Sequence, residues 1–189
     1  MDSDAEPDKL RRRFLHAGMT VLARDGYSGF KQAAVCAEAG VTTGAFYHSF
    51  RNWKAFEQAL IEHWRVESTD VLVEAARNVA DPRDRIGALL DIALSLPHDT
   101  ERAIRNWAAG DPAVMAALTE VEAARKEAIT EMGGAQYGRE LSERLAGTAM
   151  LLLIGYENAA TPSADDFTWA MRAVAEMSVS LIDAPHTDR

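Results

Sequence analysis

Residues 41–60 read VTTGAFYHSFRNWKAFEQAL and contain two helix starts in close succession. Thr42 and Asn52 are residue types that cap a helix N-terminus, because their side-chain oxygens accept hydrogen bonds from free backbone N–H groups. A helix that begins after Thr42 therefore has to end by about His48. We interpret this short helix as an exposed tip of a size that fits a groove, and the longer helix after Asn52 as the return of the chain into the body of the protein.

The rest of the chain is also helical in pattern. Gly26 is expected to end a first helix, and a second helix is expected over residues 32–39, with Gly40 as its terminator. Proline follows a capping residue at three later helix starts, which are Asp81-Pro82, Asp111-Pro112 and Thr161-Pro162. No stretch alternates convincingly with period two. The sequence predicts an all-α fold of about nine helices, an N-terminal three-helix head followed by a C-terminal helical bundle.

Composition indicates a folded globular protein, with 48% hydrophobic and 26% charged residues. The longest apolar run, residues 149–154, is far below the roughly 18 residues that a membrane span needs. The first residues are acidic and resemble neither a signal nor a transit peptide. We therefore expect a cytoplasmic protein without a membrane partner.

The formal charge of −9 is unevenly distributed along the chain. Residues 9–60 hold 8 Lys and Arg against 3 Asp and Glu, whereas residues 61–189 hold 12 against 22. Such asymmetry suggests a basic working end on an acidic body, although chance clustering of surface charge gives the same count.

No catalytic or metal-binding pattern stands out. The histidines are scattered without metal-ligand spacing, and Cys36 is the only cysteine. The sequence lacks a glycine-rich phosphate loop and a nucleophile elbow. We expect no enzymatic activity, no metal and no cofactor.

Two late segments, residues 145–156 and 167–182, are apolar nearly all round, and they belong to helices expected over about residues 141–158 and 163–183. A helix that is apolar on all sides must be covered on all sides. In a chain of this size the core covers one face, so the second face plausibly meets another subunit, and two helices from each copy would make a four-helix interface. The alternative is a fully internal helix.

Residues 31–50 have the spacing of a helix-turn-helix, in which the second helix enters the major groove of DNA. Thr42 and Thr43 can donate to phosphates or base edges, and Gly44 lets the backbone approach closely. Tyr47 offers a hydroxyl on a rigid ring, and His48 also lies on the outward side. The spacing alone also occurs in other helical proteins. Phe46 and Phe50 are expected to anchor the tip to the first and fourth helices.

The stretch AEAGVTTGAFYHSFRNWKAF, residues 37–56, resembles the DNA-binding signature of the tetracycline-repressor (TetR) family. The resemblance covers about residues 10–60. It implies a DNA-binding domain at residues 1–60 and a ligand-binding and dimerisation domain at residues 61–189. The implied function is that of a homodimeric transcriptional regulator, usually a repressor, which a small ligand releases from a roughly palindromic operator on double-stranded DNA.

The resemblance also implies roles for single residues. Thr42, Thr43, Gly44, Tyr47 and His48 fall on the recognition-helix face, and Lys54 falls where a lysine contacts the DNA backbone. Two positions depart from the family pattern, because Lys31 and Gln32 stand where the family has a Ser or Thr cap and an apolar residue. Lys31 would add a phosphate contact and lose the side-chain cap, and Gln32 could reach a base or be solvated.

Candidate residues for a small, mostly apolar ligand come from the central helices, because aromatic and methionine side chains suit such a molecule and an arginine can hold a carboxylate. They are Trp64, Arg105, Trp107, Met115, Leu118, Met150 and Tyr156; the favoured alternative for each is that it is simply a core residue. A helical adaptor that binds another protein through its late helices is the alternative function. It leaves the basic N-terminal end and the short helix unexplained.

Overall fold

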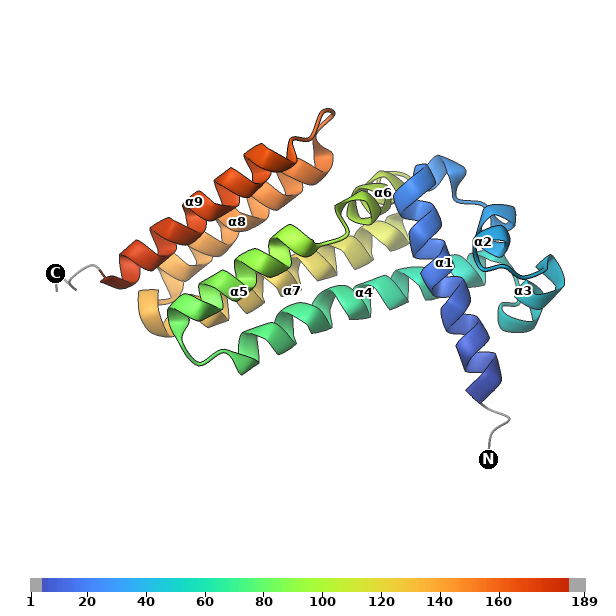
Figure 1. Ribbon diagram of the computed structural model, residues 1–189, viewed down its shortest axis with the longest axis horizontal. Helices are drawn as coiled ribbons and strands as arrows, with labels where there is room; N and C mark the ends of the chain where they lie inside the picture. The colour runs from blue at the N-terminus through green and yellow to red at the C-terminus, as the bar shows by residue number, and fades with distance from the viewer. Residues whose placement is uncertain (1–4, 184–189) are drawn as a thin grey trace. The chain divides into compact units, whose positions relative to one another are not determined.

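The computed structural model describes the backbone of residues 5–183 and the side chains of residues 8–68 and 79–182. This part of the chain forms nine α-helices and no strand, so the predicted all-α fold is confirmed (Figure 1). The helices are α1 (Ala5–Gly29), α2 (Gln32–Glu38), α3 (Thr43–Ser49), α4 (Trp53–Asn78), α5 (Pro82–Ser95), α6 (His98–Ala108), α7 (Pro112–Tyr137), α8 (Arg139–Asn158) and α9 (Ala164–Asp183). None of the described helices is both long enough and apolar enough to span a bilayer.

The described residues divide into two compact units. The first contains the chain up to residue 67 together with residues 97–118, and the second contains residues 68–96 and the chain from 119 onward. Helix α6 and the start of α7 thus belong to the same unit as α1, α2 and α3. The sequence analysis did not foresee this arrangement, because a long-range packing partner leaves no local signal.

Capping explains why the chain breaks where it does around α3. The Thr42 side chain accepts a hydrogen bond from the backbone N–H of Ala45 at 3.4 Å, and Asn52 Oδ1 accepts one from Ala55 at 2.8 Å. Both N-caps are as predicted. Gly40 has a φ of 62°, a left-handed conformation that glycine adopts without strain, and it ends α2.

The core of the first unit is aromatic. Phe14 of α1 contacts Phe46 of α3 edge-on, with ring centroids 5.4 Å apart, and Phe56 of α4 lies 5.5 Å from Phe46 and 5.0 Å from Phe50. All four rings are buried, and such pairs stabilise by about 0.5–1.5 kcal/mol beyond their burial. The predicted anchoring of the tip to the first and fourth helices is confirmed.

The second unit has an aliphatic and methionine-rich core. Met150 and Leu153 of α8 pack with Phe167 and Met171 of α9, and the Tyr156 ring stacks on Phe167 at 4.4 Å. Helix α9 contacts both α8 and α5. Helices α8 and α9 contribute buried residues to this core, whereas α5 contains none.

Candidate nucleic-acid interface

Helix α3 separates into a buried aromatic face and an exposed polar face. Phe46 is fully buried, whereas the Tyr47 side chain next to it is 56% exposed. Four further residues predicted to meet DNA are exposed at the start and the end of the helix, and they are Thr42, Thr43, Gly44 and His48. The buried face fixes the helix to its unit, so the polar face is presented on a rigid support.

The structure brings the two predicted polar positions of α2 and α3 together. The Tyr47 hydroxyl donates to Gln32 Oε1 over 3.5 Å, which is a long hydrogen bond. Gln32 is half-buried, and its Nε2 is buried without a hydrogen-bond partner among the described residues. Gln32 therefore lies against α3 and is not freely solvated.

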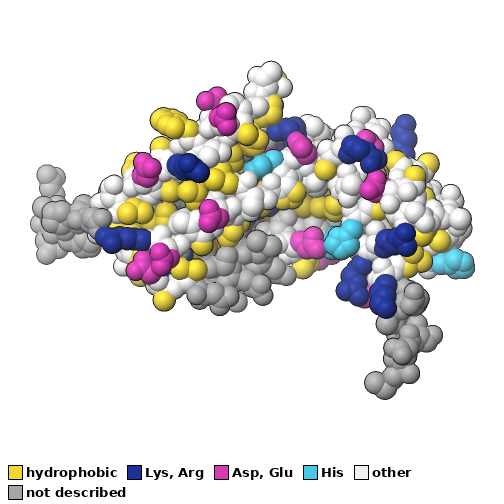
Figure 2. All heavy atoms as spheres, viewed as in Figure 1, with side chains coloured by type: hydrophobic (Ala, Val, Ile, Leu, Met, Phe, Trp, Pro, Cys, Tyr) yellow, Lys and Arg dark blue, Asp and Glu magenta, His cyan; other side chains and the backbone are white. Residues whose placement is uncertain are grey.

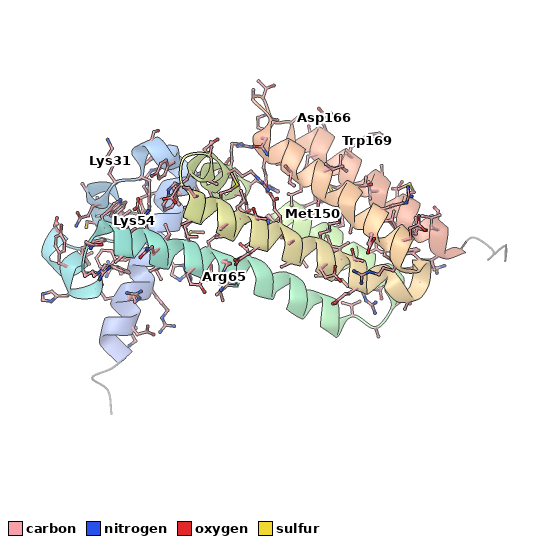
Figure 3. All side chains as sticks on the ribbon, turned by 180° about the vertical axis from the view of Figure 1, so that it is seen from behind. Lys31, Lys54, Arg65, Met150, Asp166 and Trp169 are labelled. Atoms are coloured by element: carbon pink, nitrogen blue, oxygen red, sulfur yellow. The ribbon has the colours of Figure 1, made fainter. Side chains whose placement is uncertain are left out.

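Lys31 is exposed at the N-cap of α2, and its side chain makes no capping hydrogen bond (Figure 3). The predicted loss of the cap is confirmed. The amine can instead reach solvent or an anion beside the helix start.

Lys54 is held by an acidic residue that the sequence analysis did not associate with it. Its Nζ donates to Asp111 Oδ2 at 2.8 Å and lies 3.9 Å from Glu57 Oε2. The hydrogen bond to Asp111 raises the pKa of Lys54, and the same bond lowers the pKa of Asp111. Asp111 Oδ1 also accepts from the N–H of Ala113 at 3.0 Å and so caps α7. The Asp111-Pro112 signal predicted this cap, but a cap signal does not specify which lysine the second oxygen faces.

Helix α1 adds a cation that the sequence analysis missed. Arg11 Nη1 donates to the carbonyl of Ser49 at the end of α3 over 3.1 Å, and the guanidinium lies 4.5 Å from the centroid of the Phe50 ring. Arg11 is exposed, so it places positive charge beside α3. The basic run at residues 9–13 was the available signal. Figure 2 shows Lys and Arg side chains gathered around α1 on this face.

Two of the few acidic residues in residues 9–60 are neutralised away from α3. Arg24 Nη1 lies 2.6 Å from Glu38 Oε2, and Arg24 Nε lies 2.9 Å from Asp25 Oδ1. The hydrogen bonds to Asp25 and Glu38 raise the pKa of Arg24, and the bond from Arg24 lowers the pKa of Asp25. This cluster joins α1 to α2 and holds the carboxylates of Asp25 and Glu38 in ion pairs.

The residues predicted for ligand binding are distributed over both units. Trp64, Arg105, Trp107, Met115 and Leu118 belong to the first unit, and Met150 and Tyr156 belong to the second.

Packing contacts explain the positions of the two tryptophans in the first unit. Trp64 Nε1 donates to the buried carboxylate of Glu101 at 3.0 Å, and the Trp107 ring stacks on Tyr27 at 4.8 Å. Met115 is 44% exposed. Trp64 and Trp107 join α6 to α4 and α1, so their aromatic character serves the core of the first unit.

Comparison with known proteins agrees with this geometry. Residues 14–56 match the sequence model of a family described as bacterial regulatory proteins, tetR family. No curated protein matches the chain.

Solved structures share the fold over nearly the whole chain. A TetR-family transcriptional regulator from Rhodococcus sp., described as putative, is 19% identical with a TM-score of 0.72, over 90% of this chain and 98% of that chain. A TetR-family regulator from Agrobacterium tumefaciens is 18% identical with a TM-score of 0.69, over 90% and 98%. Reduced NemR from E. coli is 15% identical with a TM-score of 0.70, over 94% and 100%.

Residues 14–56 therefore resemble the TetR family of bacterial regulatory proteins in sequence, and the described residues share the fold of the solved TetR-family regulators.

Proposed function

We propose that this chain is a homodimeric repressor that binds a roughly palindromic operator and is released by a small, mostly apolar ligand. In this proposal residues 1–60 bind DNA, and residues 61–189 bind the ligand and form the dimer. The observation that carries the proposal is the division of α3 into a buried aromatic face and an exposed polar face.

The exposed face of α3 suits the major groove of double-stranded DNA. A helix of seven residues can reach base edges with its first turn, where Thr42, Thr43 and Gly44 lie. Tyr47 then reaches a phosphate oxygen through its hydroxyl, while Lys31 and Arg11 supply positive charge on either side. Lys54 joins these contacts when it exchanges Asp111 for a phosphate.

Exposed apolar side chains on α8 and α9 support the dimer. Leu151 and Trp169 are each 73% exposed, and Met177 is 47% exposed; Trp169 is labelled on α9 in Figure 3. Large apolar side chains that gather on neighbouring helices mark an interaction surface. A second copy would bury them in a two-fold four-helix interface.

Selection of bound sequences from a random duplex pool, at two salt concentrations, tests the proposal. We expect a palindromic consensus whose half-sites lie about 34–36 Å apart, or a longer related spacing, and weaker binding at the higher salt. No enrichment at either concentration would contradict the proposal. The apolar surface of α8 and α9 would then favour the helical adaptor.

A further inference from the structure

The second unit contains a cavity of about 110 Å³ that is lined by α5, α7, α8 and α9 and is partly open to solvent. Most of its lining side chains are apolar, and Met150 is the one residue predicted for ligand binding that lines it (Figure 3). The polar side chains in the lining are Arg85, Arg125, Gln136, Tyr137, Ser142 and Ser178.

Helix α5 provides the apolar wall. Its Ile86, Leu89, Leu90 and Ala93 side chains line the cavity, yet none of the residues of α5 is buried. Figure 2 shows hydrophobic side chains in the region between α5 and α9. An apolar helix face that borders a cavity gains stability when an apolar molecule covers it, by about 25 cal/mol for each Å² removed from water.

The cavity has one polar end. Arg85 lies near the start of α5, and its Nη1 donates to the carbonyl of Met132 on α7 at 3.1 Å. Tyr137, the last residue of α7, donates its hydroxyl to the carbonyl of Ser178 on α9 at 2.7 Å. Ser142 on α8 lies against the same segment of α7, because a Cβ atom on Gly133 would come within 2.8 Å of its Oγ. These contacts gather Arg85 and the hydroxyl groups where the start of α5 meets the end of α7.

The opposite end is mostly apolar. Leu96 follows α5, and it packs against the cluster of Met150, Leu153 and Met171. All four residues line the cavity. A molecule that fills the cavity therefore meets mostly apolar side chains, with Arg85 and the hydroxyl groups at one end and Arg125 of α7 about two helical turns before Met132.

Charge decides which polar group fits that end. Among the described residues that line the cavity, two are arginines and none is a carboxylate, lysine or histidine. The hydrogen bonds of the Arg85 guanidinium all go to backbone carbonyls, those of Val79 at 2.9 and 3.1 Å, Ala80 at 3.2 Å and Met132 at 3.1 Å. No described carboxylate forms an ion pair with Arg85.

The guanidinium of Arg85 retains donor capacity. A guanidinium has five N–H groups, and the four hydrogen bonds leave about one of them, on Nη1, for another acceptor. An anionic acceptor gains a charge-assisted hydrogen bond here, whereas a cation would lie beside an unneutralised positive charge.

We propose that this cavity binds an amphipathic monocarboxylate, with its apolar chain or ring along α5 and its carboxylate at Arg85. The inference rests on the proposed function, because it names the chemical class of the releasing ligand. It also separates this end of the cavity from Arg105, the arginine that the sequence analysis associated with a carboxylate and that belongs to the first unit.

Three probes of equal chain length and different head group test the inference, namely decanoate, 1-decanol and decylamine. Isothermal titration calorimetry of the full chain should show decanoate binding roughly ten-fold or more tightly than decanol, because a charged hydrogen bond adds to the shared apolar contact. Decylamine should bind most weakly. Equal affinities for decanoate and decanol, or a preference for decylamine, would overturn the inference.

Variants locate the head group. Arg85→Gln should reduce the affinity for decanoate to about that for decanol and leave decanol unchanged. Arg85→Lys keeps the charge and should keep the preference for decanoate. Arg83→Gln is the matched control, since Arg83 is exposed on the same helix and does not line the cavity. An undiminished preference in Arg85→Gln would contradict the assignment.

Replacement of Arg85 can also disturb the fold, because its guanidinium donates to backbone carbonyls. A second variant therefore leaves Arg85 in place. Ala149→Trp places a large ring in the cavity lining from α8 and should abolish binding of decanoate and decanol while helical content persists by circular dichroism. Unchanged binding would place the decanoate elsewhere and refute the site.

Operator binding of the same preparation separates the two proposals. Intact operator binding without any decanoate binding refutes the inference and leaves the DNA-binding proposal standing. Decanoate binding that depends on Arg85, in a chain that enriches no DNA sequence, supports the cavity assignment and contradicts the proposed function.

Discussion

Helix α3 and the pair α8 and α9 expose side chains of opposite character. Helix α3 buries its aromatic residues and turns hydroxyl, imidazole and backbone groups outward, whereas α8 and α9 leave Leu151 and Trp169 largely exposed. A polar exposed face suits phosphates and base edges, and an apolar one suits a second protein surface. The comparison teaches that two partners of different chemistry are expected at different helices, and that each can be removed without the other.

The largest effect is expected from charges placed on the apolar surface. The double variant Leu151→Glu and Trp169→Glu loses about 1.5–3 kcal/mol of burial for each side chain and adds the cost of an unpaired buried charge. We expect the dimer to dissociate in sedimentation velocity. Ala123→Glu, at an exposed position of α7, is the control. A double variant that sediments as the wild type would show that this surface is not the interface.

Removal of the Tyr47 side chain should affect DNA and leave the dimer intact. Tyr47→Ala loses the phosphate contact and the hydrogen bond to Gln32, and we expect operator binding to weaken by ~1–3 kcal/mol in a gel-shift titration. Tyr47→Phe retains the ring and isolates the hydroxyl. Unchanged operator affinity in Tyr47→Ala would remove Tyr47 from the interface.

Lys31 stands at the N-cap of α2 without a capping side chain, so its replacement should change fold stability and operator affinity in opposite directions. Lys31→Ser restores a side-chain acceptor at the N-cap and should stabilise the fold by about 1 kcal/mol, which thermal unfolding measures. The same change removes a positive charge, so operator binding should weaken by a similar amount at every sequence tested. A gain in stability without any loss in DNA affinity would indicate that Lys31 does not reach a phosphate.

The smallest effect concerns the Lys54 and Asp111 pair. Asp111→Asn keeps an N-cap residue on α7 and releases Lys54 from an exposed ion pair, a type that contributes ~0.2–1 kcal/mol. Operator affinity should rise by no more than that, and the salt dependence should steepen by about one phosphate contact. The pKa of Asp111 is lowered and that of Lys54 is raised, so both groups stay charged near neutrality and the gain should be equal at pH 6 and pH 8.

A double-mutant cycle that combines Asp111→Asn with Lys54→Gln shows whether the gain in operator affinity comes from the release of Lys54. If Asp111→Asn acts through Lys54, the gain disappears in the double variant. A gain that survives Lys54→Gln would assign the effect to the net charge of the surface instead.

The local parts of the fold could be predicted from sequence because their signals are local. Thr42 and Asn52 act as the caps that their residue types indicate, and the spacing of Phe46 and Phe50 places both in the core. The contacts of Lys54 and Arg11 could not be predicted, because they depend on which distant segment packs beside them. Residues 97–118 join the first unit through tertiary packing alone.

The same distinction explains the ligand-site candidates. Trp64 and Trp107 are large and aromatic, as pocket residues are, but the structure uses them to hold α6 in the first unit. The cavity is instead lined by the half-buried apolar face of α5 and by Arg85, whose backbone partners are Val79 and Ala80 after α4 and Met132 of α7. Composition alone cannot distinguish an apolar side chain that is covered from one that is not.

The most direct test of the central claim is a hydroxyl-radical footprint on the selected duplex, for the wild type and for the Leu151→Glu and Trp169→Glu variant. The wild type should protect two tracts related by a dyad, about 34–36 Å apart or at a longer related spacing, because two α3 helices bind together. The variant should lose both tracts at the same concentration. A single tract for the wild type, or two tracts that persist in the variant, would contradict a dimer that reads DNA through α3.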